Sequence, residues 1–255
     1  MSKFVDRLKR QIVPSAQPIG FRAPEVAKTP ALLLALHFPQ PEAGAIASAA
    51  RESPDALLVD IKKAKAADLE GMGRAAGEIP LGYALAEPPN PEEMQQLQES
   101  GCDFLVFEPT DMPLQLWEGI KAGKVLKIDL SLPEGWLRAI DEVEVDAVLV
   151  GSAPEAGLSL HDLLAYHRLA NLIAKPILAS VAPDVGSSEL QALSQARVAG
   201  IVVTSASAED ICRLRRTIEA LPPPRRRPRK LEAVLPPLPG MPGAAEEEEI
   251  ETEEA

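Results

Sequence analysis

Residues 124–131 read KVLKIDLS, an apolar run that Lys127 and Asp129 interrupt. In a β-strand successive side chains point to opposite faces, so these two charged residues share one face. The opposite face is wholly apolar and consists of Leu126, Ile128 and Leu130. The stretch therefore predicts a strand that is covered on both sides and that gathers its charges on one of them.

Similar apolar runs recur along the chain. Seven other segments share this length and apolar content: 31–38, 56–61, 81–86, 104–107, 147–150, 177–181 and 200–203. Each is too short for a core helix and has the length of a buried strand. Helix-like segments such as 91–100 and 160–174 alternate with them. Eight such units predict a single (β/α)8 barrel with short loops over residues 31–221, and an open doubly wound sheet is the alternative.

The composition narrows the class of protein. The chain has 255 residues, of which 46% are hydrophobic, and its formal net charge of −12 argues against wide nucleic-acid binding. No apolar run approaches the ~20 residues that span a bilayer, and the N-terminus lacks a signal-peptide core. Cys102 and Cys212 show neither pairing nor metal-ligand spacing. These features predict a cytoplasmic protein that does not act at a membrane.

The two ends of the chain differ from the predicted barrel. Residues 1–30 begin with apolar side chains at helical spacing, which predict a helix that caps the barrel, followed by an extended lead-in. Residues 222–255 are proline-rich and then acidic, a composition typical of a disordered tail. The alternative is that the tail docks on a protein partner, with 231–235 (LEAVL) as its anchor.

Polar groups gather where the predicted strands end. In a (β/α)8 barrel the functional groups occupy the C-terminal ends of the strands, and here those ends carry His37, Asp60, Lys62, Glu87, Glu108, Lys127, Asp129, Ser152, Ser180, Thr204 and Ser205. Helices cover the outside of such a barrel, so the wholly apolar strand faces should point outward. Asp60, Lys62, Lys127 and Asp129 would then point inward, as an active site or as a salt-bridge plug without a substrate.

The first functional hypothesis is acid–base catalysis on a small anionic substrate. Asp60, Lys62 and Lys127 would be its catalytic residues, and Lys127 could alternatively form a Schiff base. Glu87, Glu108 and Asp129 follow one another at intervals of 21 residues, and three carboxylates on adjacent strand ends suit a Mg²⁺-like ion. A lysine after strand two with acids ending strands three to five resembles the enolase superfamily. That resemblance implies metal-assisted proton abstraction.

The second hypothesis is phosphate or flavin binding. Residues 125–205 resemble phosphate-binding TIM barrels, including the flavin-dependent dehydrogenases, through a strand-five lysine and the segments KPILA (175–179) and GIVVTSA (200–206). The resemblance implies that backbone groups after strands seven and eight hold a phosphate or FMN, here around Ser187, Ser205 and Ser207. A third alternative is a catalytically silent barrel that acts as an interaction module through its tail.

Overall fold

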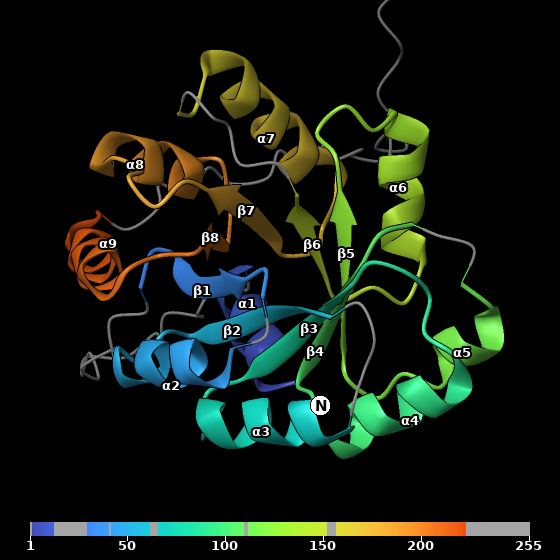
Figure 1. Cartoon of the computed structure of the whole chain (residues 1–255). Coiled ribbons are helices and arrows are strands. Elements are labelled where there is room, and N and C mark those ends of the chain that lie inside the picture. The colour runs from blue at the N-terminus through green and yellow to red at the C-terminus, as the bar shows by residue number, and fades with distance from the viewer. Residues whose placement is uncertain are drawn as a thin grey trace, which may run out of the picture. The chain divides into compact units, whose positions relative to one another are not determined.

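The structure is a computed structural model that describes residues 2–12, 30–40, 42–61, 66–109, 112–151 and 157–222, without the side chains of residues 66 and 67. The predicted site residue Lys62, the strand-end Ser152 and the predicted docking anchor at 231–235 lie outside the described residues. Within them the chain forms a single closed parallel (β/α)8 barrel, which confirms the predicted fold (Figure 1).

The strands run in chain order around the barrel. They are β1 (Leu33–Phe38), β2 (Ala56–Ile61), β3 (Leu81–Leu85), β4 (Phe104–Phe107), β5 (Gly123–Ile128), β6 (Ala147–Val150), β7 (Ile177–Val181) and β8 (Gly200–Thr204). Each strand pairs in parallel with the next one, and β8 pairs with β1 to close the barrel. Closure removes the open sheet edges that a doubly wound sheet would leave.

Helices follow the strands and cover the outside of the barrel (Figure 1). Those in the described residues are α1 (Lys3–Ile12), α2 (Ala43–Arg51), α3 (Ala66–Ala76), α4 (Pro91–Glu99), α5 (Leu114–Glu118), α6 (Glu134–Glu142), α7 (Leu160–Leu172), α8 (Ser187–Gln195) and α9 (Ala208–Ala220). Capping boxes begin α4, α7 and α9, where a side chain at each N-cap accepts a backbone N–H. None of the described helices is long and apolar enough to cross a membrane.

Two separate apolar cores reflect the alternation along each strand. On β2, Leu57 and Val59 pack outward in the core between strands and helices, whereas Leu58 packs in a second core inside the barrel. On β5, Ile128 packs outward and Val125 inward. The wholly apolar faces therefore point toward the helices, as the sequence predicts, and the inward faces carry the charged residues.

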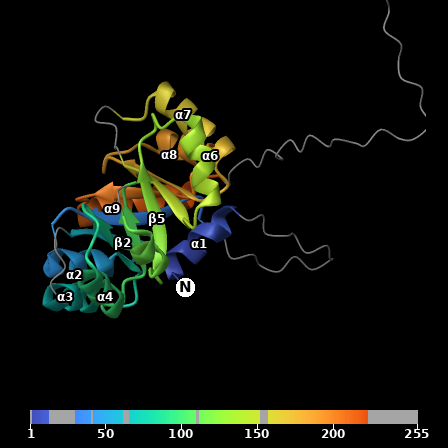
Figure 2. The ribbon, with the colours of Figure 1, turned by 90° about the vertical axis from the view of Figure 1, so that its right-hand side faces the viewer.

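Helix α1 closes the N-terminal end of the barrel, which confirms the predicted capping helix (Figure 2). Phe4 and Leu8 are fully buried in the inner core, and the ring centroid of Phe4 lies 4.9 Å from that of Phe104. Asp103, just before β4, accepts hydrogen bonds from the Ser2 hydroxyl and from the N–H groups of Lys3 and Phe4. A side chain from a neighbouring loop thus caps α1.

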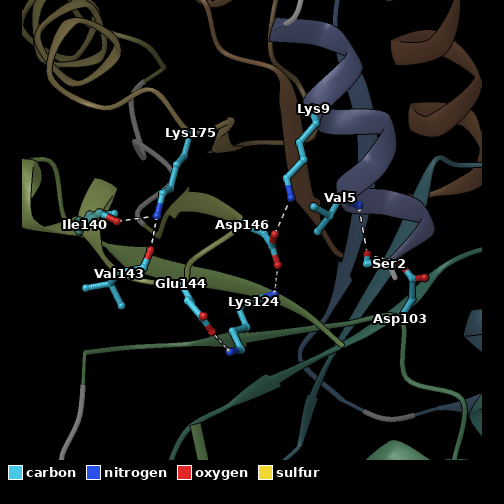
Figure 3. A network of polar contacts seen from close by, with 10 residues as sticks. All are labelled: Ser2, Val5, Lys9, Asp103, Lys124, Ile140, Val143, Glu144, Asp146 and Lys175. Carbon is cyan, nitrogen blue, oxygen red and sulfur yellow. Dashed lines mark hydrogen bonds and ion pairs between the residues drawn. The ribbon is translucent and has the colours of Figure 1, made fainter. Parts of the chain in front are cut away.

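A second contact fixes the other end of α1. The ammonium of Lys9 lies 2.6 Å from a carboxylate oxygen of Asp146, whose other oxygen accepts the N–H of Lys124 at 3.0 Å (Figure 3). Gly123, at the start of β5, meets α1 closely, since a Cβ there would lie 2.6 Å from a methyl group of Val5. The N-terminal end of the barrel is therefore occupied by protein, which leaves the C-terminal end for ligands.

Candidate functional site at the mouth of the barrel

The candidate site lies at the C-terminal ends of the strands, on their inward faces. His37 and Thr204 are register partners on β1 and β8, and Asp60 is the register partner of Ala84 on β3. Lys127 comes from β5, and Glu108 directly follows β4. The strands thus bring polar groups from distant parts of the chain to one end of the barrel, as this fold does in general.

The first group in this mouth is a chain of three side chains. His37 Nε2 lies 2.7 Å from Asp60 Oδ1, and His37 Nδ1 lies 3.0 Å from the hydroxyl of Thr204. The imidazole is mostly covered, with 20% of its side chain exposed, whereas the Asp60 side chain is 43% exposed. The Asp60 carboxylate is therefore more open to solvent than the imidazole.

The second group is an ion pair between Lys127 and Glu108. Lys127 Nζ donates to Glu108 Oε1 at 2.9 Å, and the two side chains are 40% and 58% exposed. The lysine stem lies across Gly151, which follows β6, because a Cβ at that position would come within 2.4 Å of Lys127 Cε. Glycine at 151 therefore gives the lysine the room that it needs to reach Glu108.

A pocket of about 570 Å³ joins the two groups. Its lining includes Asp60, Glu108 and Lys127, with the small apolar residues Ala84 and Val106 between them. On one side it continues toward α3, where Asp68, Leu69 and Met72 line it. This volume suits a small molecule. Asp60, Glu108 and Lys127 therefore border an open space at the mouth of the barrel.

Asp129, predicted to point inward beside Lys127, does not do so. Strand β5 ends at Ile128, and Asp129 is exposed in the turn that follows. Its carboxylate accepts the N–H of Ser131 at 2.8 Å, and this hydrogen bond holds the pKa of Asp129 below its ordinary value. The inward prediction for Asp129 is wrong because strand alternation ends with the strand.

The three carboxylates predicted to hold Mg²⁺ do not fit such a site. Glu87 is exposed beyond the end of β3, Glu108 pairs with Lys127, and Asp129 binds its own turn. Across the part of the chain that the structure describes, no three His, Cys, Asp or Glu side chains are grouped to hold a metal ion. A magnesium ion needs several oxygen ligands in near-octahedral geometry, which this arrangement does not supply.

Of the three serines predicted to surround a phosphate or FMN, Ser205 directly follows β8 and donates its N–H to the carbonyl oxygen of His37 at 3.0 Å. The other two lie at helix N-termini that already carry carboxylates. Ser207 is the N-cap of α9 and donates its hydroxyl proton to Asp210, whose pKa this hydrogen bond lowers. Ser187 begins α8, where the N–H of Gly186 donates to Glu189 at 2.8 Å. A bound phosphate at either helix N-terminus would be repelled by the carboxylate that already occupies that position. The geometry therefore gives the phosphate hypothesis no support.

The sequence-based site omitted two residues that the structure places at its centre. His37 and Thr204 lie at predicted strand ends, but neither was predicted to be a catalytic or ligand-binding residue. His37 alternates with Leu33 and Ala35, and both of these pack inside the barrel. That alternation was the signal that could have placed the imidazole in the mouth beside Asp60.

Comparison with known proteins identifies the fold and no family. No family model and no curated protein sequence matches the chain. A structure of the tryptophan synthase α2β2 complex from Pyrococcus furiosus matches with a TM-score of 0.56 at 14% identity, covering 75% of this chain and 98% of that one. N-(5'-phosphoribosyl)anthranilate isomerase from the same organism matches with a TM-score of 0.54 at 12% identity, covering 73% and 98%.

A third similar structure is an HpcH/Hpal aldolase/citrate lyase family protein from Burkholderia cenocepacia, with a TM-score of 0.52 at 15% identity, covering 73% of this chain and 91% of that one. All three structures are enzymes or enzyme-family members built on this barrel. At such low identity they show the fold alone, because this scaffold hosts many unrelated functions.

Proposed function

We propose that the protein is an enzyme that removes a proton next to the carbonyl group of a small molecule, as lyases and isomerases do. Asp60 is the base, and the ammonium of Lys127 stabilises the negative charge that develops on the carbonyl oxygen. One observation carries the proposal: both side chains line the same pocket, and each is held by a partner at its rim.

The surroundings of Asp60 suit a base. One carboxylate oxygen accepts the Nε2–H of His37, which fixes the direction of the side chain. Within the described residues, the other oxygen accepts no hydrogen bond, so it is available to a substrate proton. A positioned base of this kind typically accelerates a reaction 10²- to 10⁴-fold.

The surroundings of Lys127 suit an electrostatic role. Its ammonium extends over Gly151 to the rim of the pocket, where Glu108 is its partner. Because this ion pair is half exposed, exchanging Glu108 for a substrate oxygen costs little. A cation directed at a developing oxyanion contributes more in the transition state than in the ground state, which is what catalysis requires.

The pocket also bears on the substrate. Among the described lining residues, Lys127 supplies an ammonium that suits a carbonyl oxygen. We therefore favour a small carbonyl compound as the substrate.

The experiment detects the proposed step without knowledge of the full reaction. The full-length protein is incubated in heavy water with a panel of small aldehydes, hydroxyketones and 2-oxo acids, and proton NMR follows the loss of each C–H signal next to the carbonyl. We expect exchange of at least one compound. Asp60→Asn should slow it by ~100-fold or more, and Lys127→Met by a similar factor, because the variants remove the base and the cation.

The matched control is Lys121→Met, which removes an exposed lysine from the segment before β5 and should leave exchange unchanged. Denaturation by urea verifies that each variant is folded. Exchange that survives in Asp60→Asn would remove Asp60 from its proposed role. Absence of enzyme-dependent exchange across the panel would overturn the proposed reaction class.

A further inference from the structure

The imidazole of His37 is held at both of its nitrogens. A carboxylate oxygen only accepts hydrogen bonds, so the nitrogen that faces Asp60, Nε2, carries the proton. In the neutral ring Nδ1 is then an acceptor, and the hydroxyl of Thr204 donates to it. A ring turned by half a rotation would present carbon atoms to both partners, so the two contacts together select one tautomer and one orientation.

The backbone holds Thr204 in place for this contact. Thr204 and His37 are register partners of the β1–β8 pair that closes the barrel, and the N–H of Ser205 donates to the carbonyl oxygen of His37 at 3.0 Å. Strand β8 ends there, since Ser205 has a φ of 53°. The hydroxyl is therefore fixed beside Nδ1 by the closure of the barrel, with few rotatable bonds between them.

A hydroxyl suits this position because it both donates and accepts. It donates to Nδ1 when the ring is neutral, and it accepts from Nδ1–H when the ring is protonated. A backbone carbonyl or an ammonium would fit only one of these states. Thr204 thus keeps the ring in the same place when the charge beside Asp60 changes.

We infer that Thr204 is a positioning residue, which acts through His37 to keep one oxygen of Asp60 directed into the pocket. This inference rests on the proposed function. A hydroxyl, an imidazole and a carboxylate in this order also form the catalytic triads in which the hydroxyl is the nucleophile, the imidazole its base and the carboxylate the group that orients the imidazole. Here, however, Asp60 lines the pocket, and Thr204 is not among its described lining residues. The hydroxyl therefore serves the carboxylate and does not attack a substrate.

The direct test is NMR of the full-length protein with isotope-labelled histidine. The chain contains only three histidines, so His161 and His167 are internal references. At a pH where the ring is neutral, wild-type His37 should be protonated on Nε2. Thr204→Val, which keeps the shape and removes the hydroxyl, should shift the Nδ1 resonance of His37 alone, and Thr204→Ser should restore it.

Two further variants sharpen the result. Asp60→Asn lets an amide donate to Nε2, so a measurable share of the ring should carry its proton on Nδ1 instead. Thr204→Ala repeats the loss of the hydroxyl and decides the question if Thr204→Val does not fold. In the heavy-water assay, either hydroxyl-free variant should slow exchange roughly tenfold, as expected for one lost hydrogen bond, and Thr204→Ser should not.

The inference is overturned if His37 keeps its Nδ1 resonance in the folded hydroxyl-free variants, or if the wild-type ring carries its proton on Nδ1. Covalent labelling of Thr204 by an acyl-transfer reagent, in a pattern that requires His37, would also overturn it. Because the NMR measurement needs no substrate, its outcome is separate from that of the proposed function. An enzyme without the exchange reaction could still show the contact, and an active one could lack it.

Discussion

Replacing Phe4 by alanine should strongly destabilise the barrel, although Phe4 lies in a short N-terminal helix at the end of the barrel opposite the mouth. Its side chain is fully buried inside the barrel, and its ring packs against that of Phe104 with centroids 4.9 Å apart. Truncating a buried phenylalanine costs about 3–5 kcal/mol, and an aromatic pair accounts for about 0.5–1.5 kcal/mol. We therefore expect the variant to lose about 4 kcal/mol of its free energy of unfolding.

The measurement is chemical denaturation followed by circular dichroism, with the loss read from the shift of the midpoint at constant slope. Ile12→Ala is the matched control, because Ile12 ends the same helix and is 40% exposed. It should cost less than about 1 kcal/mol. If Phe4→Ala costs no more than Ile12→Ala, the helix does not close the barrel, and the conclusion that only the C-terminal end is open to ligands fails.

Three further predictions concern single groups. In Gly151→Ala the added methyl group would meet the Lys127 stem, so the variant should displace Lys127 and slow exchange in heavy water at least tenfold at unchanged stability. A crystal structure of the variant with Lys127 in its original place would refute this prediction. Burial raises the pKa of Asp146, but hydrogen bonds from the backbone N–H of Lys124 and the ammonium of Lys9 outweigh burial, so the pKa lies below its value in the unfolded chain. The ionised Asp146 therefore stabilises the fold above about pH 4, and this stabilisation is lost as the pH falls further. Unfolding by urea should therefore show that Asp146→Asn costs more stability near neutral pH than at about pH 3. The carboxylate of Glu52 raises the pKa of the Cys212 thiol, so Glu52→Gln should speed its reaction with iodoacetamide, as mass spectrometry can measure.

The architecture followed from the sequence because one physical rule governs every strand. A strand that carries a helix on its outer side must present apolar side chains to that helix, and alternation then sends the other residues inward. For β2 and β5 this placed Asp60 and Lys127 inside the barrel, where the structure has them.

The rule failed where the strand ended. Alternation applies only while the backbone is extended, and the sequence of residues 124–131 does not mark the point at which β5 turns. Asp129 instead binds the N–H of Ser131, a local hydrogen bond that short acidic side chains readily form in turns. Glu108 also follows its strand, yet its longer side chain still reaches Lys127.

His37 and Thr204 show a different limit. They are separated by 167 positions and become neighbours only because β8 pairs with β1. Neither residue is unusual at a strand end when it is considered alone. Their hydrogen bond forms only because the barrel closes. The pair could be read from the sequence only after the fold had been assumed and every inward position compared.

The exposure of the ion pair between Lys127 and Glu108 argues against a stabilising plug. A plug has to be shielded from water, since ion pairs as exposed as Lys127 with Glu108 contribute only about 0–1 kcal/mol. Here the small residue Ala84 lines the pocket between the charged side chains, and Gly151 gives the stem of Lys127 room to reach the rim. The mouth thus keeps its charged groups in contact with an open pocket, at little benefit to stability. Such an arrangement is expected where the charges act on a ligand, and the heavy-water experiment tests that use directly.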